Sequence, residues 1–346
     1  MRTLLVTGGC GFIGSHFVKL VLRERPRYRV VNLDLLTYAG NPENLVTEKR
    51  TQDSSTYRFV QGDVADASLV GQLIDEESVD AVVNFAAETH VDRSLLDSAP
   101  FLRTNVEGTR VLLETASARS IERFLQVSTD EVYGSLEPSE PSFTEESSLK
   151  PNSPYAASKA AADLLVRAYH RSYGVPSLIT RCGNNYGPYQ FPEKFLPLFI
   201  TNALDDRPLP LYGDGQQIRD WIHVEDHAGA LLKVLEQGNP GDLYNISANA
   251  ENTNQQMAEE ILRLLGKPRQ LIRYVKDRAG HDRRYSVNAS KLRRELGWEP
   301  IIDLETGLRA TIDWYCRERG WWERIKSGEY RKYYAQLYGE RLGLRQ

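Results

Sequence analysis

Two acidic side chains and a hydroxyl lie next to one another directly after a strand-like run. The run Phe124–Val127 is mostly apolar, and Thr129, Asp130 and Glu131 follow it in a short polar stretch. Open α/β sheets keep their reactive groups in such stretches at strand ends. Adjacent carboxylates tend to push each other's pKa values apart, which suits a general acid and a general base. Taken alone, an acidic pair after a strand is also typical of a turn or a helix cap.

A tyrosine and a lysine four positions apart, Tyr155 and Lys159, are the second candidate for chemistry. On a helix, this spacing places both side chains on one face. An ammonium group beside a phenol favours the phenolate, so we expect Lys159 to lower the pKa of Tyr155 and make it a base near neutral pH. Taken alone, a tyrosine and a lysine at this spacing could equally lie on a solvent-exposed helix face. The nucleotide-binding motif at the start of the chain favours the catalytic interpretation.

That motif is a glycine-rich turn in the setting of a dinucleotide site. Gly8, Gly11 and Gly14 lie between a short apolar strand, Thr3–Val6, and a helix expected from Ile13 to about Arg23. The first glycine permits a tight turn, the second lets the backbone approach a pyrophosphate, and the third lets helix and strand pack closely. The phosphates would lie on the free amides of the helix N-terminus.

An acidic residue also lies where the ribose-binding acid of such a site is expected. Asp34 ends the next strand-like run, Arg29–Leu33, about 20 residues after Gly14. A carboxylate there accepts hydrogen bonds from the ribose hydroxyls and repels a 2′-phosphate. The sequence therefore predicts NAD rather than NADP as the cofactor.

Strand-like and helix-like segments alternate from the N-terminus to Thr180. This alternation predicts an α/β fold with a doubly wound parallel Rossmann sheet. The later chain is irregular and contains Arg219, Arg278, Arg283 and Arg284, whose guanidinium groups suit phosphate. Taken singly, each arginine is equally typical of a solvated surface. The later chain predicts a smaller mixed α/β C-terminal substrate region. We place an NAD-binding domain at residues 1–181, completed by about 224–248, and the substrate region at 182–223 and 249–346.

Composition narrows the class of protein. The chain has 346 residues, a hydrophobic content of 41% and a formal net charge of −4. This charge gives no indication of nucleic acid or an anionic membrane as partner. The three cysteines are widely spaced, which fits a reducing cytosol better than a disulfide framework. Because the sequence shows no signal peptide and no transmembrane run, we expect a cytoplasmic protein.

His223 and His227 are the one candidate for a metal site. Two histidines at this spacing can bind zinc. No third ligand lies at a recognisable spacing, and the order of residues is not that of the zincins. We assign both histidines to helix capping and packing and expect no metal.

These motifs together resemble a known family. The glycine turn with Tyr155 and Lys159 is similar to that of the extended short-chain dehydrogenase/reductase superfamily. More specific stretches resemble its dTDP-glucose 4,6-dehydratase branch: Leu36–Asn41, His90–Ser94, Ser128–Gly134, Asn184–Lys194, Asp220–His223 and Asp277–Tyr285. The resemblance extends from Arg2 to about Trp298. Sugar epimerases of the superfamily are similar too, but they lack the acidic pair.

The resemblance implies an NAD-dependent hydro-lyase that converts dTDP-glucose to dTDP-4-keto-6-deoxyglucose and water, the first committed step of deoxysugar biosynthesis. The reaction would proceed by oxidation at C4, elimination across C5 and C6, and hydride return to C6. Tyr155 would take the proton of the 4-hydroxyl, and Lys159 would bind the nicotinamide ribose. Glu131 would remove the C5 proton, Asp130 would protonate the leaving 6-hydroxyl, and Thr129 would hydrogen-bond the 4-oxygen.

The resemblance also implies the binding residues. The cofactor would contact Gly8, Gly11, Phe12, Ile13, Gly14, Asp34, Leu36, Thr37, Asp63, Val64, Phe85, Ala86, Ala87, Thr104, Tyr155, Lys159 and Asn184. The nucleotide sugar would contact Thr89, Thr129, Asn184, Asn185, Glu193, Lys194, Phe195, Pro210, Tyr212, Arg219, Asn254, Asp277, Arg278 and His281. We expect a homodimer joined through helices of roughly Ala99–Ala118 and Tyr155–Tyr173.

Other functions on the same fold stay open. A nucleotide-sugar 4-epimerase or decarboxylase would not need Glu131 and would release no water. A 4,6-dehydratase of another nucleotide sugar would use the same residues. A cofactor-sensing regulator would keep the dinucleotide site and lose the chemistry, and the complete set of candidate catalytic residues argues against it.

Overall fold

The computed structural model describes residues 2–339 and 341–342. Its main element is a seven-stranded sheet in the order β10-β6-β5-β4-β1-β2-β3, in which all neighbours are parallel. The strands are β1 (Arg2–Thr7), β2 (Tyr28–Asp34), β3 (Tyr57–Gln61), β4 (Ala81–Asn84), β5 (Arg123–Thr129), β6 (Ser177–Cys182) and β10 (Leu243–Ile246). The order reverses between β1 and β4, as in a doubly wound Rossmann sheet. The predicted fold class is confirmed.

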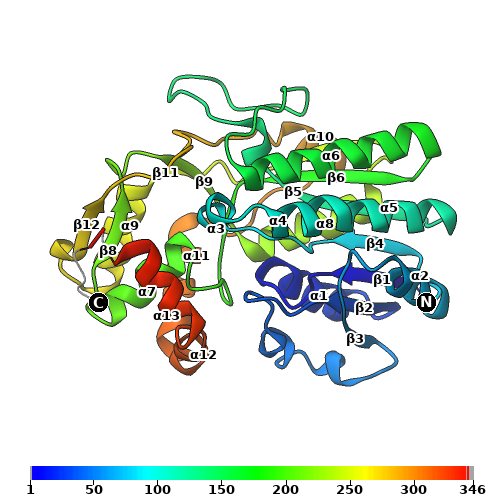
Figure 1. Cartoon of the computed structure of the whole chain (residues 1–346), viewed down its shortest axis with the longest axis horizontal. Helices are drawn as coiled ribbons and strands as arrows, with labels where there is room; N and C mark the ends of the chain where they lie inside the picture. The colour runs from blue at the N-terminus through cyan, green and yellow to red at the C-terminus, as the bar shows by residue number, and fades with distance from the viewer. Residues whose placement is uncertain (1, 340, 343–346) are drawn as a thin grey trace.

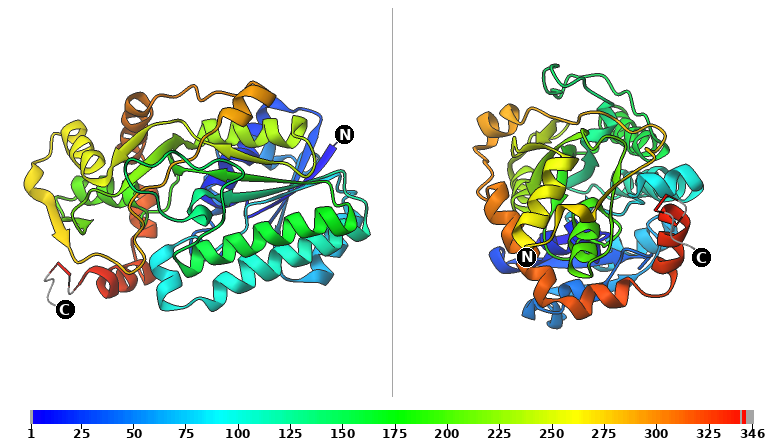
Figure 2. Two further views of the ribbon diagram at one scale, coloured as in Figure 1. Left: turned by 90° about the horizontal axis from the view of Figure 1, so that it is seen from above. Right: turned by 90° about the vertical axis from the view of Figure 1, so that its left-hand side faces the viewer.

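Helices cover both faces of this sheet (Figures 1 and 2). One face carries α1 (Phe12–Glu24) and α8 (Val224–Gln237), and the other carries α2 (Ala67–Glu76), α5 (Thr109–Ala118) and α6 (Pro154–Tyr173). Before α5 come α3 (Val91–Leu96), α4 (Ala99–Phe101) and a π-helical turn, Leu102–Gly108. The helix predicted over 99–118 is therefore present, with this π-helical turn inside it.

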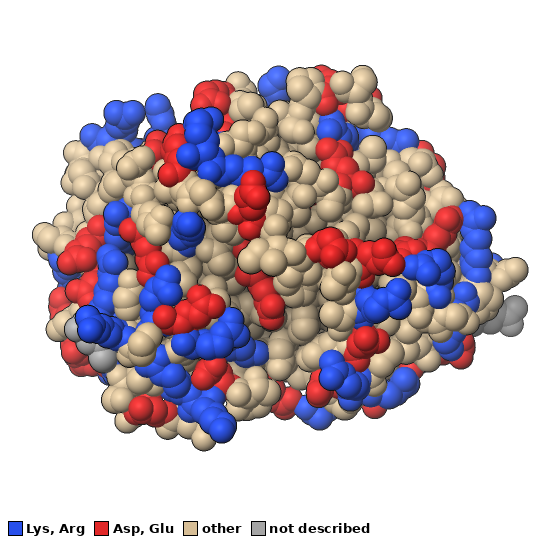
Figure 3. Space-filling model, turned by 180° about the vertical axis from the view of Figure 1, so that it is seen from behind, with Lys and Arg blue, Asp and Glu red and all other residues tan. Residues whose placement is uncertain are grey.

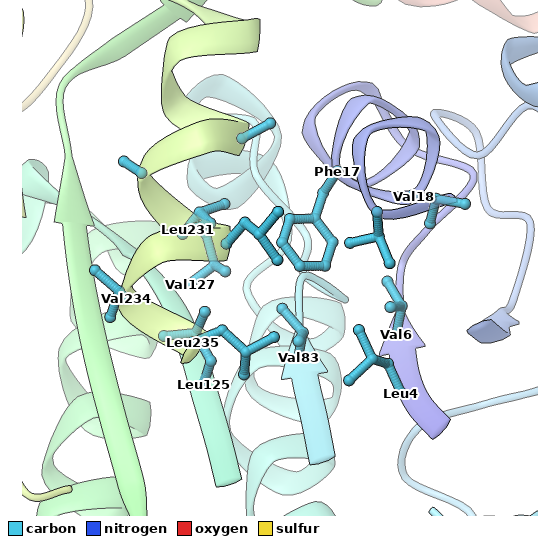
Figure 4. Packing of buried hydrophobic residues seen from close by; sticks show 14 of the residues in the cluster. Leu4, Val6, Phe17, Val18, Val83, Leu125, Val127, Leu231, Val234 and Leu235 are labelled. Carbon is cyan, nitrogen blue, oxygen red and sulfur yellow. The ribbon is translucent and has the colours of Figure 1, made fainter. Parts of the chain in front are cut away.

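The core follows from the alternation of side chains along the strands. Leu4 and Val6 of β1 pack with Phe17 of α1 and Leu231 of α8 on one face (Figure 4). Leu5, between them in sequence, joins the cluster beneath the helices of the other face. Strands buried on both faces need nearly continuous apolar sequence, which β1 has. Burying each such side chain stabilises the fold by roughly 1.5–3 kcal/mol.

The C-terminal region is smaller and contains a mixed sheet. β9 (Ile218–His223) pairs parallel with β7 (Asn184–Tyr186) and antiparallel with β11 (Glu251–Thr253), while β8 (Leu209–Tyr212) pairs with β12 (Ile272–Val275). Its helices are α7 (Phe195–Leu204), α9 (Asn254–Leu265), α11 (Leu304–Arg317), α12 (Arg319–Ile325) and α13 (Glu329–Tyr338). The helix α10 (Ser290–Leu296) instead packs on the large sheet, beside α8 and β10. Between β9 and β11 the chain returns to the large sheet as α8 and β10. The exact domain limits stay a prediction.

The surface and the helices give two further observations. On the face of the molecule seen in Figure 3, acidic and basic side chains are intermixed. Among the described residues, no helix has the length and apolar character needed to cross a membrane.

A buried ion pair fixes α6 against the sheet. The Nε of Arg181, on β6, donates to the Asp163 carboxylate on α6 at 2.9 Å, and both side chains are almost fully buried. The same guanidinium lies over the ring of Tyr133, 4.7 Å from its centroid. Asp163 lies one helical turn after Lys159. The pair therefore helps to position α6, the helix that bears two of the candidate catalytic residues, Tyr155 and Lys159.

We predict that Arg181→Met destabilises the protein by about 3–5 kcal/mol, because it leaves the Asp163 charge buried without its partner. Equilibrium unfolding in urea measures this loss. Arg119→Met serves as the control, because Arg119 pairs with Asp75 at the exposed surface and should matter far less. Equal losses in the two variants would contradict the structural role given to the buried pair.

Candidate active site

A cavity of about 290 Å³ opens at the carboxyl ends of the parallel strands. It lies where the strand order reverses, which is the usual ligand position in such sheets. Most of the predicted cofactor residues line it, namely Gly8, Gly11, Phe12, Ile13, Gly14, Asp34, Thr37, Asp63, Val64, Phe85, Ala86, Ala87, Thr104, Tyr155, Lys159 and Asn184. Leu36 does not line it; its N–H instead donates to Asp34 Oδ1 at 2.8 Å.

The glycine turn has the geometry that only glycine allows. Gly8 has a φ of +71°, and a Cβ there would lie 2.7 Å from the backbone nitrogen of Ala86. A Cβ at Gly14 would collide with the Gly8 carbonyl. At the start of α1, Gly11 offers no side-chain cap. The first amides of the helix are therefore available to an anion, and this wall of the cavity fits a dinucleotide pyrophosphate.

Asp34 joins the glycine turn to the loop after β2. Its Oδ2 accepts the N–H of Cys10 at 2.9 Å, while Oδ1 accepts that of Leu36. Burial raises the pKa of this carboxyl, and the two backbone N–H groups oppose the rise. The residue is thus held at the cavity wall, where it fits the ribose of a dinucleotide.

Thr129 ends β5, and a 3₁₀ turn, Asp130–Tyr133, follows it at once. The Thr129 hydroxyl accepts the N–H of Glu131 at 3.3 Å and lies 3.2 Å from Asp130 Oδ1. The sequence left open that the acidic pair caps a helix. In the structure the cap of this turn is Thr129. Both carboxylates line the cavity, where they are free to meet a ligand.

The two carboxylates differ in their surroundings. Burial and the neighbouring Glu131 raise the pKa of Asp130 well above its ordinary value. Burial also raises the pKa of Glu131, but Arg278, Arg219 and Lys194 oppose that rise. A carboxyl with a strongly raised pKa suits an acid, and one stabilised by cations suits a base.

Tyr155 and Lys159 both line the cavity from α6, but their electrostatics differ from the prediction. Burial, and then the charge of Glu131, raise the pKa of Tyr155 rather than lowering it. The Lys159 Nζ donates to the Val127 carbonyl at 2.7 Å, and burial lowers the pKa of this lysine to about 8. The expectation that Lys159 lowers the Tyr155 pKa is wrong for this structure, because desolvation and nearby carboxylates dominate.

The predicted substrate residues fall into two groups. Thr89, Thr129, Asn184, Asn185, Glu193 and Lys194 line the cavity. Those that do not are Phe195 at the start of α7, Pro210 and Tyr212 on β8, Arg219 on β9, Asn254 at the start of α9, and Asp277, Arg278 and His281 after β12. The charges of Arg219 and Arg278 nevertheless oppose the rise in the pKa of Glu131. Contact between this second group and the substrate stays a prediction.

The cavity also has lining residues that the sequence analysis missed: Leu35, Ala39, Gly40, Glu88, Val127, Ser128, Cys182, Gly183, Gln190, Phe191 and His227. Leu35, Glu88, Ser128 and Gly183 adjoin a predicted site residue, and Cys182 ends β6, so for these five the strand ends and their neighbours are the signal. His223 caps α8 as predicted, accepting the Glu225 N–H. His227 is buried on α8, in agreement with the packing assignment, and it also lines the cavity, with its Nδ1 2.8 Å from Asn185 Oδ1.

Several buried polar atoms of the cavity wall have no partner in the described part of the chain: Ser128 Oγ, Asp130 Oδ2, Asn184 Oδ1, Gln190 Oε1, Glu193 Oε1 and His227 Nε2. A buried polar atom without a partner is costly and rare. Their concentration in one cavity indicates a site built for a polar ligand. Within residues 2–339 and 341–342, no group of three or more possible metal ligands is found.

Comparison with known proteins agrees with this geometry. The family model described as GDP-mannose 4,6 dehydratase matches residues 5–311. A curated dTDP-glucose 4,6-dehydratase of Xanthomonas campestris pv. campestris (strain B100) is 50% identical, covering 96% of this chain and 98% of its own.

Solved structures point the same way. The dTDP-glucose 4,6-dehydratase of Streptomyces venezuelae, solved with NAD bound, is 50% identical with a TM-score of 0.90, covering 94% of this chain and 100% of its own. A UDP-glucose 4-epimerase of Thermotoga maritima is 28% identical with a TM-score of 0.84, covering 92% of this chain and 100% of its own. On these similarities over nearly its whole length, the chain belongs to the dTDP-glucose 4,6-dehydratase family.

Proposed function

We propose that this chain is an NAD-dependent dTDP-glucose 4,6-dehydratase, a hydro-lyase that releases water and dTDP-4-keto-6-deoxyglucose. One observation carries the proposal. The carboxylates of Asp130 and Glu131 line the same cavity as Tyr155 and the glycine turn. An oxidation alone would need only the tyrosine and the cofactor, whereas an elimination also needs a base and an acid.

The glycine turn and Asp34 would hold NAD. The close approach at Gly8 and the available amides of α1 support this assignment, as do relatives solved with NAD bound. The cofactor supplies an acceptor, and later a donor, of hydride for the sugar.

The chain itself would handle the protons. Tyr155 takes the proton of the 4-hydroxyl, and Thr129 hydrogen-bonds the 4-oxygen. Burial and Glu131 raise the pKa of Tyr155, which opposes the phenolate that a base must be. To act as the base, Tyr155 must therefore pass on its own phenolic proton as it takes the proton of the 4-hydroxyl.

Elimination would be shared between the two carboxylates. Arg278, Arg219 and Lys194 favour the ionised form of Glu131, which can take the proton from C5. The raised pKa of Asp130 favours its protonated form, which can donate to the leaving 6-hydroxyl. The two environments thus support one base and one acid side by side.

We also propose that the protein works as a cytoplasmic homodimer. Leu96, Leu102 and Leu164 are exposed by 59%, 56% and 56% of their surface. They lie on α3, on the π-helical turn and on α6, within or just before the helices expected to form the interface. Pairing with a second copy would remove this apolar surface from water.

The product distinguishes this function from its alternatives. We expect conversion of dTDP-glucose to a 4-keto-6-deoxy sugar, detected by its absorbance in alkali, with UDP-, GDP- and CDP-glucose as parallel substrates. An epimerase would yield a 4-epimer without this absorbance, and a regulator would yield no product. Either result with dTDP-glucose would overturn the proposal.

The two carboxylates should be separable by solvent deuterium. We expect Glu131→Gln to abolish entry of deuterium at C5, because the base is lost, and to slow turnover by a factor of about 10²–10⁴. Asp130→Asn should slow water loss while C5 exchange continues, because the base remains. Mass analysis of the sugar recovered from deuterated water measures both effects. Identical exchange in the two variants would contradict the division of roles.

Cofactor choice should depend on Asp34. We expect the dinucleotide released by denaturing the purified protein to be NAD, because a carboxylate at this position repels a 2′-phosphate. The variant Asp34→Ser should bind NADP better than the wild-type protein does, as measured by titration of the stripped enzyme. Recovery of NADP from the wild-type protein would contradict this assignment.

A further inference from the structure

One side of the cavity is formed by a loop that the C-terminal helix supports from behind. We call residues 189–194 the wall loop; its members Gln190, Phe191, Glu193 and Lys194 line the cavity. From α13, the Tyr330 hydroxyl donates to the Pro192 carbonyl at 2.9 Å, and its ring lies 6.2 Å from that of Phe191. The helix α13 thus contacts the wall loop from behind, through Pro192 and Phe191.

An arginine forms the second connection between α13 and the wall loop. The Arg93 guanidinium lies between two aromatic rings, 3.9 Å from the centroid of Tyr38 and 4.0 Å from that of Tyr333. Its Nε donates to Glu193 Oε2 at 3.0 Å. Two rings that hold a planar guanidinium by cation–π contact leave it little freedom, so the direction of its hydrogen bonds is fixed.

Glu193 is the group that this arrangement positions. The Arg93 guanidinium holds one of its oxygens, while the other, Oε1, is buried and makes no hydrogen bond of normal geometry to the described residues, although the Tyr38 side chain also interacts with this carboxylate. The Lys194 Nζ donates to the Thr89 carbonyl. An ionised carboxylate accepts hydrogen bonds from hydroxyls and repels a diphosphate. The open oxygen of Glu193 therefore fits a sugar hydroxyl.

We propose that Tyr333 and Arg93 are positioning residues of the sugar subsite, and that α13 is thereby part of that subsite. The proposal rests on the proposed function for the identity of the sugar. Tyr333 does not line the cavity; it restrains Arg93, and Arg93 sets the direction of Glu193. Loss of the Tyr333 ring should loosen the wall loop and weaken recognition of the sugar, while the nucleotide half of the ligand is unaffected.

The test compares three variants of the full-length holoenzyme. Tyr333→Leu removes the ring, and Tyr333→Phe keeps it. Tyr274→Leu is the control, because Tyr274 lies exposed on β12 and the same exchange of tyrosine for leucine there leaves Arg93 and the wall loop unchanged. Hydrogen exchange of residues 189–194, followed by mass spectrometry, reports on the wall loop without any ligand. Calorimetric titration with dTDP-glucose and with dTDP separates the sugar from the nucleotide.

We expect Tyr333→Leu to speed exchange in the wall loop and to weaken dTDP-glucose binding by roughly tenfold, with dTDP binding unchanged. Tyr333→Phe and Tyr274→Leu should behave like the wild-type protein. Unchanged wall-loop exchange in Tyr333→Leu, or an equal loss of affinity for dTDP, would overturn the proposal. If the wild-type protein did not bind dTDP-glucose, the proposed function would fail, and the exchange data alone would decide the role of Tyr333.

Discussion

The site depends on one constraint: a buried carboxyl, Asp130, lies beside a second carboxylate, Glu131, whose charge raises its pKa. Asp130 and Glu131 are adjacent in sequence at the end of β5, and both lie in surroundings that disfavour charge. The opposing cations come from distant parts of the chain, with Arg219 on β9 and Arg278 after β12. The Rossmann sheet therefore supplies the acidic groups. The C-terminal region supplies the positive charges that stabilise their ionised forms.

Sequence reasoning found those parts of the site whose residues lie within one short stretch of the chain. The spacing of Gly8, Gly11 and Gly14 follows from one strand, one turn and one helix, so a short window contains all the information. Asp34 and Thr129 could be found in the same way, because each ends a strand of the parallel sheet. The sheet itself was predictable because strands buried on both faces have long apolar runs.

The parts that were missed or wrong depend on contacts between distant segments. His227 faces the cavity only because β9 and α8 bring it beside Asn185. The Tyr155 pKa is governed by desolvation and by Glu131, which lies on another element, so the spacing of Tyr155 and Lys159 could not reveal its direction. The stacking of Tyr38 and Tyr333 on Arg93 joins three segments that no local pattern connects.

The return of the chain to the large sheet has a consequence for its synthesis on the ribosome. β6 is complete at Cys182, but its outer neighbour β10 begins only at Leu243, after β7, β8 and β9 have been made. Until then the emerging chain exposes β6 as an unpaired strand edge, which can pair with another chain. A nascent chain halted between these two strands would keep this edge open, because the strand that covers it has not yet been made.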